Sequence, residues 1–185
     1  MLEPTCWPDF DKEIKTLYSL YYYMGIKMWG EYFSYRMTMR KFLESDNPFM
    51  GKGSNIINDM KTVIEFININ KSSNDLLSVH SVIENKIELL FYWITREISF
   101  NHEINNDLVR NKYYDLFAAT EKIVTGIIAT EQTINPLLIN MYNDYPEWKD
   151  ESQIINLGQS YFSFYKNLGI EPYDLNGNIE FKLID

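Results

Sequence analysis

Apolar residues return every three or four positions along most of this chain, a spacing that places them on one face of an α-helix. The stretches with this spacing lie at residues 11–43, 54–67, 74–100, 107–128 and 152–168. Gly25 and Gly30, inside the first stretch, indicate close packing or a bend. The segments between the stretches do not resemble an interdomain linker. The pattern therefore predicts an all-α fold, a single helical domain over residues 1–185 that forms a bundle of five or six helices.

Proline, glycine and polar residues set the expected ends of the later helices. Pro136 is expected to stop one helix and to start a short one over residues 136–142, because proline fits the first turn of a helix but not its interior. Asp150 or Ser152 is expected to cap the start of the last helix. Gly169 is expected to cap its end.

Residues 170–185 have a different pattern. The Asn176-Gly177 dipeptide favours the tight turn of a β-hairpin, because both residues accept a positive φ. From Ile179 onward apolar and polar residues alternate, as on a strand with one buried face. This segment is predicted to form a small C-terminal β-hairpin, or a strand added to the helical domain.

The chain is acidic, with 26 Asp and Glu against 17 Lys and Arg and a formal net charge of -9. Nine of the acids but only three of the bases lie from residue 131 onward, so the last third carries a balance of -6. A negative surface repels nucleic-acid phosphates and anionic lipids and attracts basic proteins. We therefore expect a basic protein partner, with no direct binding to nucleic acid or membrane. The pattern does not indicate an oligomeric state.

Composition also bounds the location and the chemistry. Cys6 is the one cysteine, so no disulfide can form within the chain. The N-terminal residues lack the basic and apolar segments of a signal peptide, and the longest apolar run is far too short to cross a bilayer. These features predict a cytoplasmic protein. With two histidines and no matching ligand spacing, we assign no catalytic, metal or cofactor site.

One pair of residues is nevertheless suited to catalysis. Arg96 and His102 are separated by five residues near the end of the third predicted helix. This spacing resembles the Arg-x(4 to 6)-His motif of HEPN domains, and the resemblance implies an all-helical, metal-independent ribonuclease in which a dimer joins two motifs. The residue after the arginine, commonly Asn, Asp or His in that family, is Glu97 here. In the alternative interpretation Arg96 pairs with a nearby acid and His102 lies in a solvated loop within the polar segment 101–106.

The segment from Tyr142 to Glu151 combines aromatic and acidic side chains around Pro146. Rigid aromatics supply binding area at a low entropy cost, and carboxylates around them speed the encounter with a basic partner. The residues expected to bind this partner are Tyr142, Asp144, Tyr145, Glu147, Trp148, Asp150 and Glu151. The alternative is a solvated loop in which Trp148 packs into the core and the acids cap the next helix.

The leading functional hypothesis is a non-enzymatic, acidic protein-binding role. In its most specific form it is an immunity or inhibitor protein that neutralises a basic bacterial toxin, expected to be a nuclease, because nucleases need positive clefts to bind polyanions. Two alternatives remain open. One is the HEPN-like ribonuclease that uses Arg96 and His102, and the other is a phage or viral accessory protein that binds a host factor.

Overall fold

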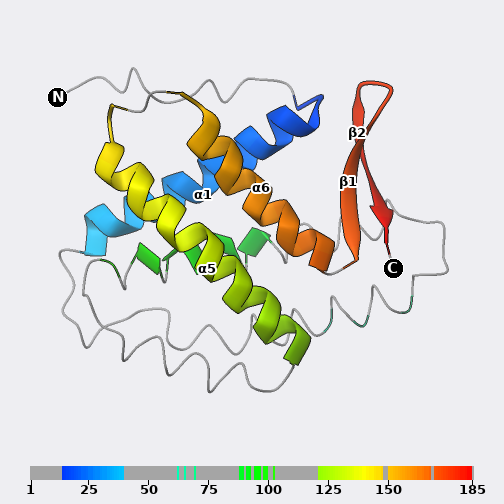
Figure 1. The fold of residues 1–185 in the computed structure, drawn as a ribbon, viewed down its shortest axis with the longest axis horizontal. Helices are drawn as coiled ribbons and strands as arrows, with labels where there is room; N and C mark the ends of the chain where they lie inside the picture. The colour runs from blue at the N-terminus through cyan, green and yellow to red at the C-terminus, as the bar shows by residue number, and fades with distance from the viewer. Residues whose placement is uncertain are drawn as a thin grey trace.

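The computed structural model describes residues 14–39, 62, 65, 69, 88–89, 91–92, 94–96, 98–99, 102, 121–147, 150–167 and 169–184. These residues are mostly helical and include one two-stranded antiparallel sheet at the C-terminal end (Figure 1). The elements are α1 (Leu17–Met39), α5 (Glu121–Asp144), α6 (Ser152–Asn167), β1 (Ile170–Leu175) and β2 (Asn178–Leu183). The number of helices in the bundle depends on residues outside these ranges.

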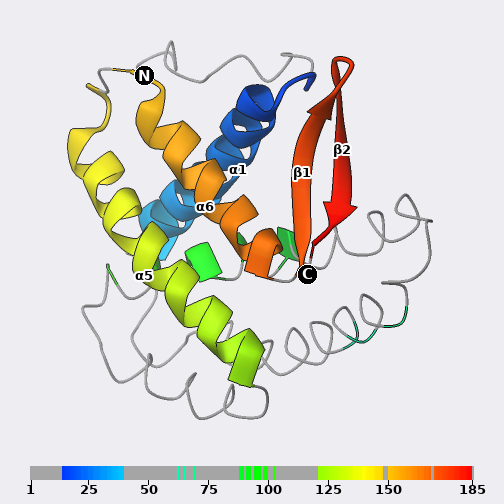
Figure 2. The ribbon, with the colours of Figure 1, turned by 45° about the vertical axis from the view of Figure 1, so that its right-hand side comes forward.

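α1 is the central helix of the described core. α6 crosses it closely, and α5 packs beside α6 and the C-terminal half of α1 (Figures 1 and 2). Side chains from several faces of α1 are buried, among them Tyr22, Met24, Ile26, Met28, Trp29 and Tyr32. A helix that is apolar on most of its circumference is typically an interior helix, because several neighbours can bury it. The helix predicted over residues 11–43 is confirmed from Leu17 to Met39, whereas the described residues 14–16 precede it and are not helical.

The segment 88–102 packs on α1 through both polar and apolar side chains. Its described residues are helical, and Phe91, Ile94 and Ile98 are buried. Lys27 on α1 pairs with Glu88 at 2.5 Å, and the Ser99 hydroxyl donates to the backbone carbonyl of Tyr32 at 3.0 Å. The third predicted helix is therefore helical at every position described. Of the second, predicted over residues 54–67, residues 62 and 65 are helical and the remainder lies outside the described residues. Residue 69 is also helical, so the predicted end of helical structure at residue 67 is wrong.

The expected interruption of α5 at Pro136 is wrong. α5 runs continuously from Glu121 to Asp144 with Pro136 inside it. The proline is exposed, whereas Ile134, Leu138 and Met141 are fully buried on the inner side of the helix. Burial on both sides of the proline holds the helix together, and water can satisfy the carbonyl that proline leaves without a donor. The predicted start of this helix near residue 107 lies outside the described residues.

The last helix and the hairpin begin and end close to the positions that the sequence predicts. Asp150 accepts a hydrogen bond from the Ser152 amide at 2.8 Å at the start of α6, and Gly169 ends the helix with a φ of 83°. β1 and β2 are joined by a two-residue turn in which Asn176 and Gly177 both have positive φ, a conformation that asparagine tolerates and that glycine adopts freely because it has no Cβ. The predicted small hairpin is therefore confirmed. Among the described helices, none combines the length and apolar character that a membrane span requires.

Candidate functional site

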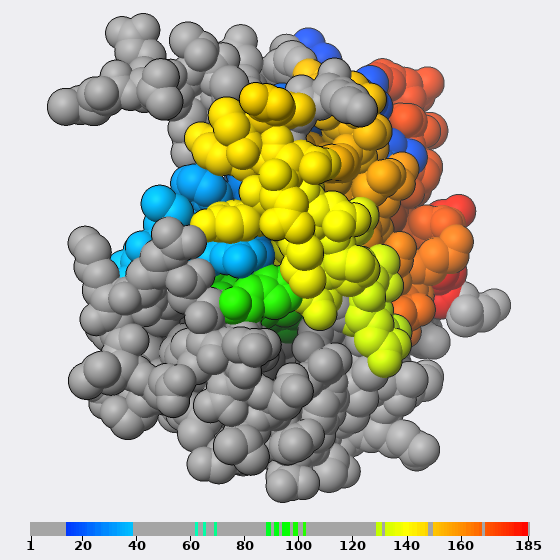
Figure 3. Space-filling model, turned by 60° about the vertical axis from the view of Figure 1, so that its left-hand side comes forward, coloured from blue at the N-terminus to red at the C-terminus, as the bar shows by residue number. Residues whose placement is uncertain are grey.

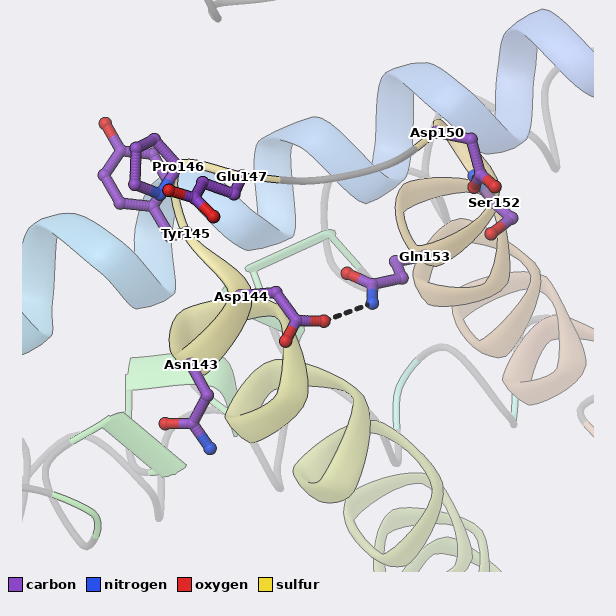
Figure 4. A pocket seen from close by; sticks show the side chains of 8 residues that line it. All are labelled: Asn143, Asp144, Tyr145, Pro146, Glu147, Asp150, Ser152 and Gln153. Atoms are coloured by element: carbon purple, nitrogen blue, oxygen red, sulfur yellow. Dashed lines mark hydrogen bonds between the residues drawn. The ribbon is translucent and has the colours of Figure 1, made fainter.

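An open hollow of about 630 Å³ lies where α5 ends and α6 begins. It is lined by Asn143, Asp144, Tyr145, Pro146, Glu147, Asp150, Ser152 and Gln153 (Figure 4). Three of these residues carry a carboxylate, and the described lining includes no Lys, Arg or His. Most of the lining therefore belongs to the aromatic and acidic segment, Tyr142 to Glu151, that the sequence singled out.

The shape of the hollow follows from hydrogen bonds at the two helix ends. Asp144, in the last turn of α5, accepts a hydrogen bond from the Gln153 side chain at 2.8 Å and, through its backbone carbonyl, one from the Glu147 amide at 2.7 Å. The Asp150 carboxylate accepts the first free amide of α6, from Ser152. These contacts fix where the chain leaves α5 and where it enters α6. Figure 4 shows Gln153 turned toward Asp144 across the space between the two helices.

Two tyrosines hold this connection against α1. The Arg36 guanidinium lies 3.7 Å from the centre of the Tyr142 ring, a cation–π contact. The Tyr145 ring is 4.9 Å from Phe33 and 6.3 Å from Trp29, and 40% of Tyr145 remains exposed. The space-filling view shows the end of α5, in yellow, lying directly beside the end of α1, in light blue (Figure 3). The tyrosines thus position the acids as well as offering aromatic surface.

Glu151 faces away from the hollow and toward α1. Its carboxylate accepts a hydrogen bond from the Tyr18 hydroxyl at 2.8 Å. This hydrogen bond, with smaller contributions from burial and nearby carboxylates, raises the pKa of the Tyr18 phenol. Glu151 therefore ties the start of α6 to the start of α1.

The structure brings four of the predicted binding residues together in the hollow, namely Asp144, Tyr145, Glu147 and Asp150. Tyr142 and Glu151 lie beside it, and Trp148 lies outside the described residues. Ser152 and Gln153 line the hollow but belong to α6 and were not predicted. No sequence signal marks Gln153, because its place depends on how α6 turns relative to the end of α5.

Gln153 adds an acceptor to the carboxylates. Its side-chain nitrogen is bound to Asp144, whereas its side-chain oxygen is buried and accepts no hydrogen bond from the described residues. Carboxylate and amide oxygens together suit a ligand that brings several N–H donors, such as a guanidinium or an ammonium group. Within the described ranges, no three His, Cys, Asp or Glu side chains form a group that could hold a metal ion.

Arg96 and His102, the second predicted pair, contact neighbouring residues of α1. The Arg96 guanidinium pairs with Glu31 at 2.6 Å and lies 4.9 Å from the centre of the Tyr35 ring. His102 is helical and half-buried, so the expected solvated loop at this position is wrong. Its Nδ1 lies 2.7 Å from the Tyr32 hydroxyl.

The hydrogen bonds around His102 determine which nitrogen of its ring carries the hydrogen. The Asn135 side-chain oxygen, 2.5 Å from His102 Nε2, can only accept, so Nε2 carries the hydrogen. Nδ1 is then the acceptor for the Tyr32 hydroxyl, which itself accepts from Arg36 at 2.5 Å. Burial lowers the pKa of His102, the hydrogen bond to Asn135 opposes this effect, and the charge of Arg36 adds to it. The imidazole is thus held neutral between α1 and α5.

Comparisons with known proteins give no family to which these sites could be assigned. No family model, curated protein or solved structure matches this chain.

Proposed function

We propose that this chain is a non-enzymatic binding protein that presents the acidic hollow between α5 and α6 to a basic protein. The most specific form of the proposal is an immunity or inhibitor protein that neutralises a basic toxin domain, with a nuclease as the preferred target. The alternative, a phage or viral accessory protein, would bind a basic host factor through the same hollow by the same electrostatic attraction.

One observation carries the proposal. Three residues that line the hollow carry a carboxylate, the buried side-chain oxygen of Gln153 accepts no hydrogen bond from the described residues, and no described lining residue supplies a compensating positive charge. Carboxylates gathered in this way make the local potential negative and attract a positively charged group, which supports a basic partner. The aromatic residues that hold the acids are already packed on α1, so binding should cost little conformational entropy for ordering them.

The negative charge of the hollow is expected to act mainly on the rate at which the basic partner associates. Complementary potentials raise association rate constants by one to three orders of magnitude, and added salt removes much of the gain. A nuclease cleft has the matching positive potential because it must hold a polyanion. The proposed inhibitor would therefore bind fast at low ionic strength and cover the cleft.

The test begins with capture of the partner from the native organism on the immobilised full chain, followed by identification by mass spectrometry. Association is then measured by surface plasmon resonance at several salt concentrations, for the parent and for Glu147→Lys. Glu147 suits this purpose because its side chain makes no hydrogen bond or ion pair with the described residues. We expect Glu147→Lys to slow association about tenfold and to flatten its salt dependence.

Glu65→Lys is the matched control. Glu65 is a helical, exposed acid that does not belong to the lining of the hollow. Its substitution changes the net charge by the same amount as Glu147→Lys, but it should alter association much less, because salt screens charges that lie away from the contact. Equal rates for both variants, or capture of no basic protein, would contradict the proposal. RNA cleavage by the purified chain that is lost in His102→Ala would instead support the ribonuclease alternative.

A further inference from the structure

His102 lies where three elements meet. In the space-filling view the green atoms of the segment 88–102 lie against both the light blue end of α1 and α5 (Figure 3). The imidazole contacts α5 through Asn135 at Nε2 and α1 through the Tyr32 hydroxyl at Nδ1. The ring of Tyr32 also lies edge-on to the imidazole, with the ring centres 5.7 Å apart. The half-buried His102 therefore joins α1 to α5, the helix whose end forms part of the acidic hollow.

Arg36 connects this contact to the hollow. Its guanidinium donates to the Tyr32 hydroxyl at 2.5 Å and lies 3.7 Å from the centre of the Tyr142 ring. Tyr142 is in the last turn of α5, directly before residues 143–145, which line the hollow (Figure 4). A single side chain thus contacts both the hydroxyl that binds His102 and the tyrosine that precedes the lining.

Aromatic contacts around Arg36 hold the end of α5 to α1. The Tyr142 ring lies edge-on to Tyr32 at 6.2 Å and is 6.1 Å from Phe33. The Phe33 ring is in turn 4.9 Å from Tyr145, which lines the hollow. The negative face of a tyrosine ring attracts a cation, so the charge of Arg36 strengthens this packing. Displacement of Arg36 would therefore alter the contacts of Tyr142 and, through Phe33, those of Tyr145.

Protonation of His102 changes the hydrogen bonds at the Tyr32 hydroxyl. In the neutral imidazole Nδ1 accepts the hydrogen of this hydroxyl, whereas in the imidazolium both ring nitrogens are donors. The hydroxyl oxygen would then face two cationic donors, the Nδ1–H group and the Arg36 guanidinium. Both positive charges would lie within hydrogen-bond distance of one oxygen, and like charges at this separation repel strongly where water is partly excluded.

Arg36 is the partner that can give way. His102 is fixed on its other side, because Nε2 carries a hydrogen in both protonation states and stays bound to Asn135. The Tyr32 ring is fully buried and is held by its packing. Arg36 is partly exposed, and its long side chain can turn its charged end toward water. Withdrawal of the guanidinium would leave the Tyr32 hydroxyl to the imidazolium and would remove the cation from the Tyr142 ring.

The groups that face the imidazole among the described residues favour its neutral form. From α1 they are the Tyr32 phenol and the charge of Arg36, and from α5 the uncharged Asn135. On the segment of the imidazole itself, Arg96 is paired with Glu31 of α1. Burial lowers the pKa of the imidazole, the hydrogen bond to Asn135 opposes this effect, and Arg36 adds to it. Protonation therefore takes place below the ordinary value of about pH 6.5.

We propose that protonation of His102 displaces Arg36 from Tyr32 and Tyr142, and that this displacement changes the shape of the acidic hollow. The structural change does not depend on what the hollow binds. Its effect on a basic partner rests on the proposed function. This partner should bind more weakly at low pH, because the lining is less ordered and a positive charge has been added near it. By linkage, the bound partner should lower the pKa of His102 further.

NMR spectroscopy of the full chain between about pH 7.5 and pH 5.5 tests the structural change, because few carboxylates titrate in this range. The imidazole signals of His102 report its protonation. The backbone amides of residues 143–145 and the side-chain amide of Gln153, which binds Asp144, report the hollow. In the parent both sets of signals should move with the same midpoint. In His102→Gln the hollow signals should stay unchanged, and in His80→Gln they should move as in the parent.

Tyr32→Phe tests whether the hydroxyl transmits the change. It keeps the buried ring but removes the oxygen that joins His102 to Arg36, so His102 should titrate without a response from the hollow. A purely electrostatic effect of the imidazolium on the hollow signals would persist in this variant. Arg36→Gln, at a partly exposed position, should have the same outcome with the Tyr32 ring unchanged. Tyr165→Phe is the matched control, because it removes the hydroxyl of another fully buried tyrosine, one that contacts Tyr161, and it should respond as the parent does.

The captured partner gives a second measurement. Its affinity should fall about tenfold from about pH 7.5 to pH 5.5 for the parent and much less for His102→Gln. An equal fall in both chains would overturn the effect on binding. Failure to capture a basic protein would contradict the proposed function and leave the NMR result standing.

Three NMR results would overturn the structural change. They are hollow signals that stay fixed while His102 titrates, hollow signals that still move in His102→Gln, and an imidazole that remains neutral over the whole range. A hollow that follows His102 in both Tyr32→Phe and Arg36→Gln would overturn the route through these two residues.

Discussion

Gly158 on α6 lies so close to α1 that a Cβ at this position would stand 1.8 Å from the backbone carbonyl oxygen of Tyr21. The contact is reciprocated one turn along the crossing, where a Cβ at Gly25 of α1 would stand 2.0 Å from the carbonyl oxygen of Ile154 on α6. In both places the obstacle is backbone, which cannot move aside as a flexible side chain can. The two glycines therefore set the distance between the helices that carry most of the described core.

We expect Gly158→Ala and Gly25→Ala each to lower the free energy of unfolding by about 2–3 kcal/mol. The added methyl group would force α1 and α6 apart and loosen the side chains between them. This loss should exceed the gain in helix propensity that alanine brings, which is about 1 kcal/mol. Urea denaturation followed by circular dichroism measures the difference.

Gly30→Ala is the matched control for these variants. Gly30 also lies inside α1, but no described atom lies within 4 Å of a Cβ placed there. Its substitution should be neutral or stabilising by up to about 1 kcal/mol. Equal losses at Gly25, Gly30 and Gly158 would indicate a general intolerance of α1 and α6 to substitution and would contradict the close-approach explanation.

Pro136→Ala should raise the free energy of unfolding by about 1 kcal/mol. The proline is exposed in the interior of α5, where it removes a backbone hydrogen bond, and alanine would restore this bond. The stiffer unfolded chain of the proline form offsets part of the gain. Asn140→Ala, at another exposed position of α5, measures the gain from helix propensity alone. A Pro136→Ala variant less stable than the parent would contradict this account.

The fold was predictable where one local signal sufficed. The spacing of apolar residues by three or four positions predicted α1. The Asn176-Gly177 dipeptide predicted the hairpin, and Gly169 predicted the end of α6. The prediction that a helix stops at Pro136 was wrong, because the local preference against proline, a few kcal/mol, is outweighed by burial of the residues on both sides of it. Tertiary packing is not visible in the local pattern.

The candidate site was predictable in part for the same reason. The acids and tyrosines between Tyr142 and Glu151 could be found because they lie together in the sequence. Gln153 could not, because only the angle between α5 and α6 brings it to Asp144. The environment of His102 was also hidden, since its partners Tyr32 and Asn135 come from distant segments of the chain.

Stability should depend on the protonation of His102. Its pKa is lowered in the folded protein, mainly by burial, so the unfolded chain takes up the proton first as the pH falls. The stabilising effect of the neutral imidazole is full above the unfolded pKa, near 6.5, and is lost as the pH falls toward the folded pKa. Protonation would also place a hydrogen on Nδ1, where the Tyr32 hydroxyl now donates. The free energy of unfolding should therefore decrease between about pH 7.5 and pH 5.5.

The contribution of His102 is isolated by comparing the parent with His102→Gln over this range of pH, in which few carboxylates titrate. The variant should be less stable near pH 7.5 and should show a smaller decrease toward pH 5.5. His80→Gln removes the other histidine of the chain and is the control. If the free energy of unfolding of His102→Gln falls with pH as in the parent, and that of His80→Gln does not, the pH dependence comes from His80 and our account is contradicted.

Gln153→Met should separate stability from binding. The Gln153 oxygen is buried and accepts no hydrogen bond from the described residues, so it costs free energy in the unbound chain. Methionine has a similar length and no such oxygen, and Asp144, which is exposed, can exchange its bond with Gln153 for water. We therefore expect the free energy of unfolding of Gln153→Met to be unchanged or raised by about 1 kcal/mol.

Binding of the basic partner should move in the opposite direction. In the proposed complex the Gln153 oxygen accepts an N–H group that enters the hollow, so its loss should weaken binding about tenfold. Gln159→Met, at an exposed position of the same helix, is the control and should change neither quantity. A Gln153→Met variant that is clearly destabilised and binds its partner normally would give this glutamine a structural role only, because the oxygen would then serve the packing of α6 rather than a ligand.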